Sequence, residues 1–210
     1  MEEWIRVIEL QKLQIPPVQA RGFIETIYQE SMKLSSMTNS FLELSRLQSG
    51  RIRMEMVSFS LADLINEVLL LLQPQADERG LIFEATLSEH AVRVTADRER
   101  IRQVLVNLTS NAVKYNRLNG LITLHATLID PQHVRVSIAD TGRGIPEKDL
   151  TRIFEKFFRV ADSEGYATGT GLGLSIVKQI VEAHGSQIDV KSQVDVGTTF
   201  SFILKAAPAE

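Results

Sequence analysis

The sequence predicts an α+β fold, in which helices cover one face of a mixed sheet and a separate helical segment comes first. From residue 51 onward helical and strand patterns alternate, and several strands are spaced to pair as antiparallel hairpins. Before that point the apolar spacing is helical throughout, without a strand pattern. We therefore expect two parts, a helical segment over residues 1–50 and an α/β sandwich over residues 51–210.

The helical segment contains two helical patterns. The first covers residues 2–14 and is interrupted at Pro16-Pro17, because proline lacks an amide hydrogen and restricts the residue before it. The second is one long helix over residues 18–48. A heptad seam on this helix prefers a partner helix, which favours a homodimeric bundle over a helix packed on its own domain. The seam consists of Ile27, Glu30, Leu34, Met37, Phe41 and Leu44.

The second part alternates between strands and helices. Ser60 with Asp63 resembles a capping box, and Gly185 is a helix stop. We expect helices over residues 60–78, 97–116 and 172–184, and a loop-rich stretch over residues 141–168. The expected strands are residues 52–58, 81–87, 92–95, 121–129, 133–139, 187–192 and 198–204.

Composition excludes several classes of protein. The net charge of −3 shows no basic excess, which argues against partners such as nucleic acid or an anionic membrane. The chain contains no cysteine, so disulfides and thiolate zinc sites are excluded. Its longest apolar runs are far too short to span a bilayer. We expect a cytoplasmic chain that makes no membrane contact itself.

The helix predicted at residues 97–116 has a polar stripe beside its apolar one. Asn107, Asn111, Lys114 and Tyr115 share this sector. Asparagine is unfavourable inside helices, so two of them one turn apart suggest a task. An amide oxygen suits Mg²⁺, a lysine suits phosphate and an aromatic ring can cover a base. For the asparagine pair alone, a solvated polar face is the simpler interpretation.

Two further segments carry candidate functional residues. Asp140 ends a predicted strand directly before Gly142 and Gly144, where its carboxylate could accept a hydrogen bond from an exocyclic amine. An ordinary Asp-Thr-Gly turn explains this segment equally well when it is taken alone. Residues 153–159 form a short helical segment with three phenylalanines, usually a core pattern, before a polar loop. Arg159 at its end could reach a terminal phosphate.

The run Gly169-Thr-Gly-Leu-Gly-Leu-Ser175 leaves backbone N–H groups uncovered where a helix begins, which suits an anion such as phosphate. Glycine also serves turns and tight packing, so the run alone is a weak signal. A dinucleotide-binding fingerprint is excluded because no strand precedes the glycines and their spacing is G-x-G-x-G. A Walker A loop is excluded because no Gly-Lys-Ser/Thr follows.

In this order, the blocks resemble the ATP-binding catalytic domain of sensor histidine kinases, in the superfamily that includes gyrase B, Hsp90 and MutL. The resemblance covers residues 52–204 and implies a Bergerat α/β sandwich with a mobile ATP lid near residues 160–170. ATP and Mg²⁺ are the implied cofactors, and a response regulator receiver domain is the implied partner. The matching blocks are residues 107–115, 140–146, 154–159, 169–175 and 196–200.

The resemblance also implies roles for single residues. Asn111 would ligate Mg²⁺, with Asn107 nearby on the phosphates, and Tyr115 would stack on the nucleotide. Asp140 would accept from adenine N6, while Lys114 and Arg159 would contact phosphates. The implied catalytic set is Asn107, Lys114 and Arg159. The rest of the implied nucleotide site is Gly142, Gly144, Ile145, Gly169, Thr170, Gly171, Leu172, Gly173, Leu174 and Thr198.

Position 107 separates kinases from ATPases. The ATPases of this superfamily have a glutamate there as a general base for water, and asparagine cannot deprotonate water. Transfer to a neutral imidazole needs no such base, since the imidazole is already a nucleophile. Asn107 therefore disfavours an ATPase of the gyrase or Hsp90 type. A serine kinase of the anti-sigma type is disfavoured because such proteins lack the long N-terminal helix.

The N-terminal part resembles the dimerisation and phosphotransfer helices of the same family. The nearest match to the family's phosphoacceptor pattern puts Gln11 at the position of the histidine, and Lys12 and Ile15 also depart from that pattern. Either an amide stands where the nucleophile is required, or the acceptor helix is absent from this sequence. No histidine precedes His90. We expect a kinase core that phosphorylates a histidine in a complete protein and relays the phosphoryl group to a response-regulator aspartate. The alternative is a degenerate kinase that acts as an ATP-dependent conformational switch or scaffold. Either way, we expect ATP binding without autophosphorylation of this chain on histidine.

Overall fold

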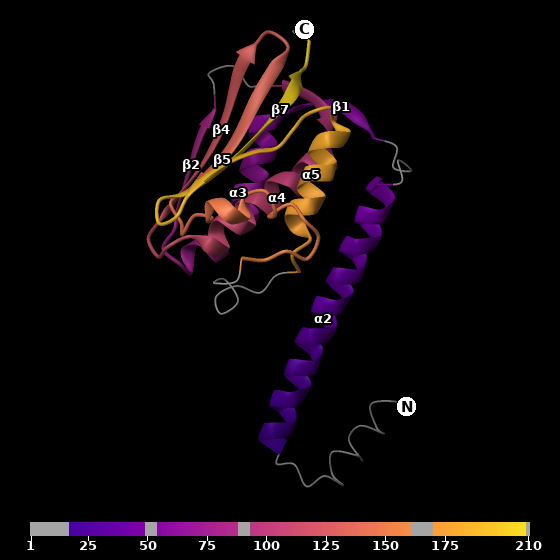
Figure 1. The fold of residues 1–210 in the computed structure, drawn as a ribbon, viewed down its shortest axis with the longest axis vertical. Coiled ribbons are helices and arrows are strands. Elements are labelled where there is room, and N and C mark those ends of the chain that lie inside the picture. Colours follow the sequence, from indigo (N-terminus) through magenta and orange to yellow (C-terminus); the bar gives the residue numbers. More distant parts are fainter. Residues whose placement is uncertain (1–16, 49–53, 88–92, 161–169, 209–210) are drawn as a thin grey trace. The chain divides into compact units, whose positions relative to one another are not determined.

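The computed structural model describes residues 17–48, 54–87, 93–160 and 170–208 (Figure 1). The chain divides into two compact units, Met1–Leu42 and Glu43–Glu210. Helix α2 spans Pro17–Gln48, so it begins one residue earlier than predicted. Proline is well suited to the first position of a helix, where an amide hydrogen has no partner within the helix. The predicted helix over residues 2–14 and Gln11, Lys12 and Ile15 lie outside the described residues.

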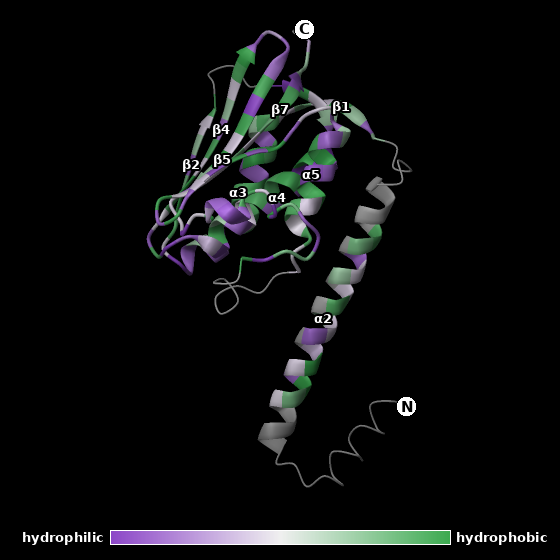
Figure 2. Ribbon diagram, in the orientation of Figure 1, coloured by the Kyte–Doolittle hydropathy of each residue, from purple (hydrophilic) through white to green (hydrophobic). Residues whose placement is uncertain are grey.

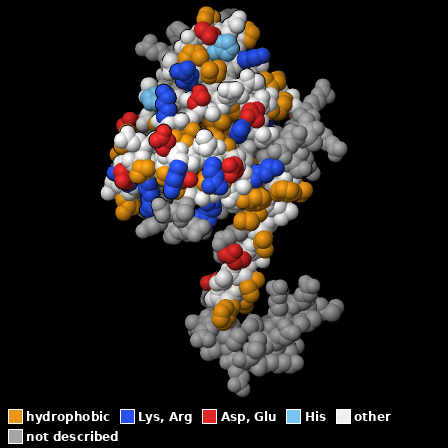
Figure 3. All heavy atoms as spheres, in the orientation of Figure 1, with side chains coloured by type: hydrophobic (Ala, Val, Ile, Leu, Met, Phe, Trp, Pro, Cys, Tyr) orange, Lys and Arg blue, Asp and Glu red, His pale blue; other side chains and the backbone are white. Residues whose placement is uncertain are grey.

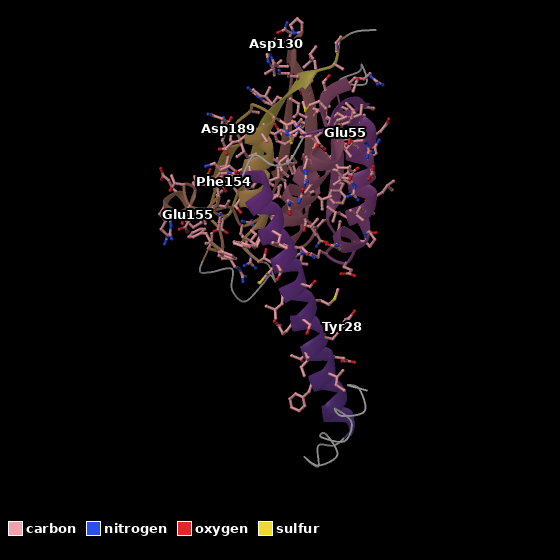
Figure 4. All side chains as sticks on the ribbon, turned by 90° about the vertical axis from the view of Figure 1, so that its right-hand side faces the viewer. Tyr28, Glu55, Asp130, Phe154, Glu155 and Asp189 are labelled. Carbon is pink, nitrogen blue, oxygen red and sulfur yellow. The ribbon has the colours of Figure 1, made fainter. Side chains whose placement is uncertain are left out.

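Helix α2 exposes large apolar side chains along its length. Phe23, Ile27 and Leu34 are 55%, 55% and 63% exposed in the single chain. Figure 3 shows several of these hydrophobic side chains at the surface of the helix, and Figure 4 labels Tyr28 among them. Within the described part of the chain, these apolar side chains of α2 are left largely uncovered.

The second unit is built on a mixed sheet of seven strands. Six of them follow the order β1-β3-β7-β5-β4-β2, and β6 also pairs with β7. All pairs are antiparallel except β2 with β4. The strands are β1 (Met56–Ser60), β2 (Ile82–Leu87), β3 (Arg93–Asp97), β4 (Leu121–Asp130), β5 (His133–Asp140), β6 (Asp189–Gln193) and β7 (Gly197–Ala206).

Helices α3 (Leu61–Asp77), α4 (Arg98–Tyr115) and α5 (Gly173–Ala183) cover one face of this sheet (Figure 1). Alternate strand residues are buried against them, which is the period-two pattern of a half-buried strand. Figure 2 shows that each helix carries both hydrophobic and hydrophilic residues, as helices with one buried face do. The buried strand residues include Ile122, Leu124, Val134, Val136, Ile138, Phe202 and Leu204.

Helix starts follow the capping residues of the sequence. Ser60 is the N-cap of α3 and its hydroxyl accepts from the Asp63 amide at 3.2 Å. Asp97 is the N-cap of α4 and accepts from the Arg100 amide at 3.1 Å, and its other oxygen accepts from the Glu55 amide. Capped ends of this kind satisfy amide hydrogens that lack helical partners.

Two predicted elements differ in the structure. Residues 52 and 53 of the strand predicted at 52–58 lie outside the described residues, and the described strand is β1 at Met56–Ser60, because its antiparallel pairing with β3 runs from Met56 opposite Asp97 to Ser60 opposite Arg93. The predicted helical segment over residues 153–159 is a series of turns. Phe157 has a φ of 63°, in the left-handed region that ends a right-handed helical turn.

Candidate nucleotide site

A cavity of about 380 Å³ lies where segments far apart in the sequence converge. Its walls come from α4, the end of β5 and the loop after it, the turns before residue 160, the start of α5 and the β6–β7 connection. Figure 4 labels Phe154 in these turns and Asp130 at the distant tip of the β4–β5 hairpin. The volume is within the range of small-molecule sites. The predicted residues that line the cavity are Asn111, Tyr115, Asp140, Gly144, Ile145, Arg159, Gly171, Gly173, Leu174 and Thr198.

The other predicted residues that the structure describes are not among those that line the cavity. Asn107 faces the start of α5, since a Cβ placed on Gly173 would lie 3.2 Å from its Oδ1. Thr170 Oγ1 accepts from the Leu172 amide at 3.3 Å, and Leu172 itself is fully buried. Lys114 is half-buried, and this burial lowers the pKa of its ammonium group. The Gly142 amide donates a hydrogen bond to the Asp140 carboxylate. Gly169 falls outside the described residues.

Sequence reasoning missed several lining residues. Ile153 and Phe158 belong to the segment already noted for its phenylalanines, so their apolar spacing could have marked them. Val194 and Asp195 reach the cavity only because the β6–β7 connection lies beside the loop after β5, a neighbourhood without a local sequence signal. The remaining residues of this group are Ala112, Arg143, Pro146, Val160 and Phe200.

Asp140 supplies a fixed acceptor at the cavity wall. Its Oδ1 accepts from the Gly142 amide at 2.8 Å, and the Thr198 amide also donates to the carboxylate. Burial raises the pKa of this carboxyl, and the two amide hydrogen bonds partly oppose the shift. A donor on a ligand would relieve the desolvation of the charged form, so the carboxylate is suited to receive one.

The loop after β5 passes very close to β6. A Cβ placed on Gly144 would lie 2.0 Å from the Gln193 carbonyl oxygen, and Gly144 has a φ of 69°. Both facts require glycine, because other residues would clash and would adopt this conformation with strain. The close approach brings Ile145 and its amide into the cavity wall.

The turns that end before residue 160 are joined to the segment that leads into α5, whereas the predicted ATP lid lies mostly outside the described residues, at 161–169. The Phe157 amide donates to the Gly171 carbonyl at 2.9 Å, and both residues have positive φ values, 63° and 71°. A Cβ on Gly171 would lie 2.8 Å from the Phe157 backbone, so glycine is needed there as well. Phe154 packs edge-on against Phe200 with centroids 6.4 Å apart, which anchors the turns on the sheet.

The N-terminus of α5 is open to an anion. Among the residues that the structure describes, no side-chain cap hydrogen bond forms at its cap residue Leu172, and no acidic residue lies in the first turn. Ser175 is turned back, since its hydroxyl donates to the Leu172 carbonyl at 2.8 Å. The amide hydrogens at the start of an uncapped helix carry partial positive charge, so this end of the cavity favours phosphate.

Two arginine side chains make hydrogen bonds at the C-terminal end of α4 and in the loop that follows it. Arg79 donates to the carbonyls of Lys114 and Asn116 at 3.1 and 2.7 Å, and so caps the C-terminal end of α4. Arg117 bonds the Asp195 backbone and pairs with its carboxylate at 3.2 Å. The α4–β4 loop is thereby tied to the β6–β7 connection that lines the cavity.

Mg²⁺ would have few protein ligands here. Within the described ranges no group of three or more His, Cys, Asp or Glu side chains could hold a metal ion. Asn111 does present an amide to the cavity. Mg²⁺ often binds through one or two protein oxygens together with substrate phosphates and water, and this donor set fits that mode.

Comparison with known proteins defines the family. Residues 96–208, more than half of the chain, match the family described as histidine kinase-, DNA gyrase B-, and HSP90-like ATPase, and the chain belongs to this family, in its histidine-kinase branch. It is 38% identical over 184 residues to the adaptive-response sensory kinase SasA of Gloeothece citriformis, with 86% of this chain and 47% of that protein covered.

Solved structures agree with this membership. The chain is similar to full-length ShkA in complex with AMPPNP, with a TM-score of 0.80, 30% identity and coverage of 97% of this chain and 43% of that one. It is also similar to histidine kinase ThkA in complex with the response regulator TrrA, with a TM-score of 0.74, 29% identity and coverage of 96% and 56%. The predicted family and α+β fold are confirmed.

The chain spans about half the length of the SasA relative. Among the described helices, none is both long and apolar enough to cross a membrane.

Proposed function

We propose that this chain is the ATP-binding kinase core of a sensor histidine kinase. It would transfer the γ-phosphate of ATP to a histidine of the complete protein, for relay to an aspartate of a response regulator. The observation that carries the proposal is the convergence of Asp140, Tyr115, Asn111 and the open N-terminus of α5 on one cavity. Asp140 and Tyr115 suit a base, Asn111 suits a metal-bound phosphate, and the N-terminus of α5 suits a terminal phosphate.

Each group has a separate task in this proposal. Asp140 orients the base by accepting from its amine, and Tyr115 covers the ring. Asn111 would hold Mg²⁺, which would supply charge neutralisation for the phosphates. The α5 amides and Lys114 bind phosphate oxygens, and Asn107 and Arg159 lie toward the transferred group. Because Asn107 cannot deprotonate water, the site holds ATP for an incoming imidazole and does not activate hydrolysis.

Calorimetric titration with a non-hydrolysable ATP analogue and Mg²⁺ tests the nucleotide site. We expect binding by the full chain and at least tenfold weaker binding by Asp140→Asn, since a buried acceptor for the amine is replaced by a group that also carries donors. Asp189→Asn, on an exposed strand position outside the cavity, is the matched control and should bind normally. Absence of binding by the unaltered chain would refute the assignment.

Transfer to histidine is tested in a second experiment. The chain is incubated with γ-labelled ATP and a separate histidine-containing phosphotransfer domain. Acid-labile label on the added domain is the expected result, with none on this chain, where Gln11 is the nearest match to the acceptor position. Nucleotide binding without any transfer would overturn the kinase proposal and favour the conformational switch. Label on this chain would contradict the interpretation of Gln11.

We also propose that α2 forms a homodimer through its apolar seam. The support is the exposure of Ile27 and Leu34 in the single chain, together with their heptad spacing. Ile27→Glu should shift the chain to monomer in sedimentation experiments, because it buries a charge in the helix interface. Asn39→Glu, at an outer heptad position, is the control and should leave the dimer intact. A monomeric unaltered chain at about 100 μM would contradict the proposal.

A further inference from the structure

We propose that Ser192 determines which purine the pocket accepts, by fixing the Thr198 hydroxyl as a hydrogen-bond acceptor. This inference rests on the proposed nucleotide binding. Ser192 lies on β6 and does not line the cavity, whereas Thr198 on β7 does. Ser192 would therefore act through its neighbour as a positioning residue.

Three groups contact the Ser192 hydroxyl oxygen. The Ile145 amide lies at 2.8 Å, the Gly197 carbonyl oxygen at 3.0 Å and Thr198 Oγ1 at 2.8 Å. A serine hydroxyl has one proton to donate and two lone pairs that accept. The hydroxyl can therefore form three hydrogen bonds, one with each of these three groups.

Only one arrangement of protons makes all three contacts hydrogen bonds. The Ile145 N–H can only donate, so it occupies one lone pair of Ser192. The Gly197 carbonyl can only accept, so it takes the Ser192 proton. The Thr198 hydroxyl must then donate its own proton to the second lone pair of Ser192. Each polar group in the cluster is satisfied in this arrangement, as buried polar groups usually are.

The consequence appears on the cavity side of Thr198. With its proton directed to Ser192, Thr198 Oγ1 offers only lone pairs to a ligand. Its neighbour Asp140, which accepts from the Thr198 amide, also offers only acceptors when ionised. This part of the wall favours a base with an exocyclic amine at the matching position. A carbonyl oxygen there would face two acceptors, so 6-oxo purines should bind more weakly.

The prediction concerns a ratio of affinities. ADP and inosine diphosphate differ in the base only at C6 and the adjacent N1, so their ratio of Kd values reports on this edge. Ser192→Ala releases the Thr198 proton, which can then be donated to a 6-oxo group. We expect the preference for ADP to fall about tenfold, the worth of one hydrogen bond. Ser192→Thr keeps a hydroxyl and should keep the preference.

The ratio separates this role from simple damage to the site. Ser192→Ala also leaves the Ile145 amide without this partner, which weakens both nucleotides alike and cancels in the ratio. In the Thr198→Val background, removal of the Ser192 hydroxyl should leave the ratio unchanged, because the group through which it acts is gone. If the alanine variant does not fold, Ser192→Cys gives the same comparison, since a thiol fills the volume but bonds weakly.

Calorimetric titration of the full chain with each diphosphate and Mg²⁺ gives the result. An unaltered chain that binds neither nucleotide refutes the proposed function itself. If it binds both equally, or if it prefers ADP and Ser192→Ala retains that preference within about twofold, the role of Ser192 is overturned while nucleotide binding stands. An effect of Ser192→Ala that persists in the Thr198→Val background also overturns it.

Discussion

Replacement of Arg79 by alanine should destabilise the second unit through the end of α4. The last carbonyls of a helix have no donors within it, and the Arg79 guanidinium supplies two of them, to Lys114 at 3.1 Å and to Asn116 at 2.7 Å. A cation at this position also interacts favourably with the helix dipole. Lys114 and Tyr115 occupy the same last turn, so the substitution also affects the candidate site.

The magnitude follows from counting these interactions. Two hydrogen bonds from a charged donor are worth about 1.5–3 kcal/mol each. Against this stands Arg79 Nε, which is buried and has no hydrogen-bond partner among the described residues, at a cost of about 1–3 kcal/mol. The midpoints of the two ranges are about 4.5 kcal/mol for the pair of bonds and about 2 kcal/mol for the unpaired Nε, so we expect Arg79→Ala to lower the free energy of unfolding by about 2.5 kcal/mol.

Urea unfolding followed by far-ultraviolet circular dichroism measures the change. Arg79→Lys should lose about half as much, because an ammonium cannot bond both carbonyls in the geometry of a planar fork. Arg135→Ala on the exposed face of β5 is the matched control and should stay within about 0.5 kcal/mol of the unaltered chain. A change of less than about 0.5 kcal/mol for Arg79→Ala would refute the reasoning.

Three further predictions can be tested in the same way. Gly144→Ala should lower the free energy of unfolding by more than about 2 kcal/mol and weaken nucleotide binding. Gly185 has a similar φ of 74° but open space around it, so Gly185→Ala should lower the free energy of unfolding by only about 1–2 kcal/mol. Equal losses in the two variants would contradict the clash of a Gly144 side chain with β6. Thr109→Val should raise the free energy of unfolding by about 1 kcal/mol, because the fully buried Thr109 hydroxyl has no partner within the described residues; a loss would point to a hidden one. Burial raises the pKa of Asp140, so its contribution to the free energy of unfolding should decrease as pH rises from the ordinary aspartate range through the raised pKa, and Asp140→Asn should lack this decrease. Urea midpoints of both proteins from about pH 4 to pH 7 test this sign.

Local sequence patterns predicted most elements to within a few residues. The polar stripe on α4 is the clearest case, since helical periodicity alone places Asn111 and Tyr115 on one sector, and both line the cavity. The cap residues Ser60 and Asp97 similarly mark helix starts, because the hydrogen bonds that they make span only three residues. Such features depend on neighbours along the chain.

The turns over residues 153–159 show where local reasoning fails. Their composition is compatible with a helix, yet Phe157 adopts a left-handed conformation and donates its amide to Gly171. That hydrogen bond is available only after the start of α5 has been brought alongside. A long-range contact thus outweighs a local preference of a few tenths to about one kcal/mol per residue.

Taken alone, the amino-acid sequence determined the family resemblance, the alternation of helices and strands and the chemistry of the candidate side chains. These features depend only on the type of each residue and on the spacing of residues along the chain. Only the tertiary structure decided the strand order, the parallel pairing of β2 with β4 and the approach of the β6–β7 connection to the cavity. The place of Val194 and Asp195 in the cavity wall and the hydrogen bond from the Ile145 amide to Ser192 depend on that approach. The physical reason is that hydrogen bonds and packing act over a few ångströms of space, whatever the separation along the chain.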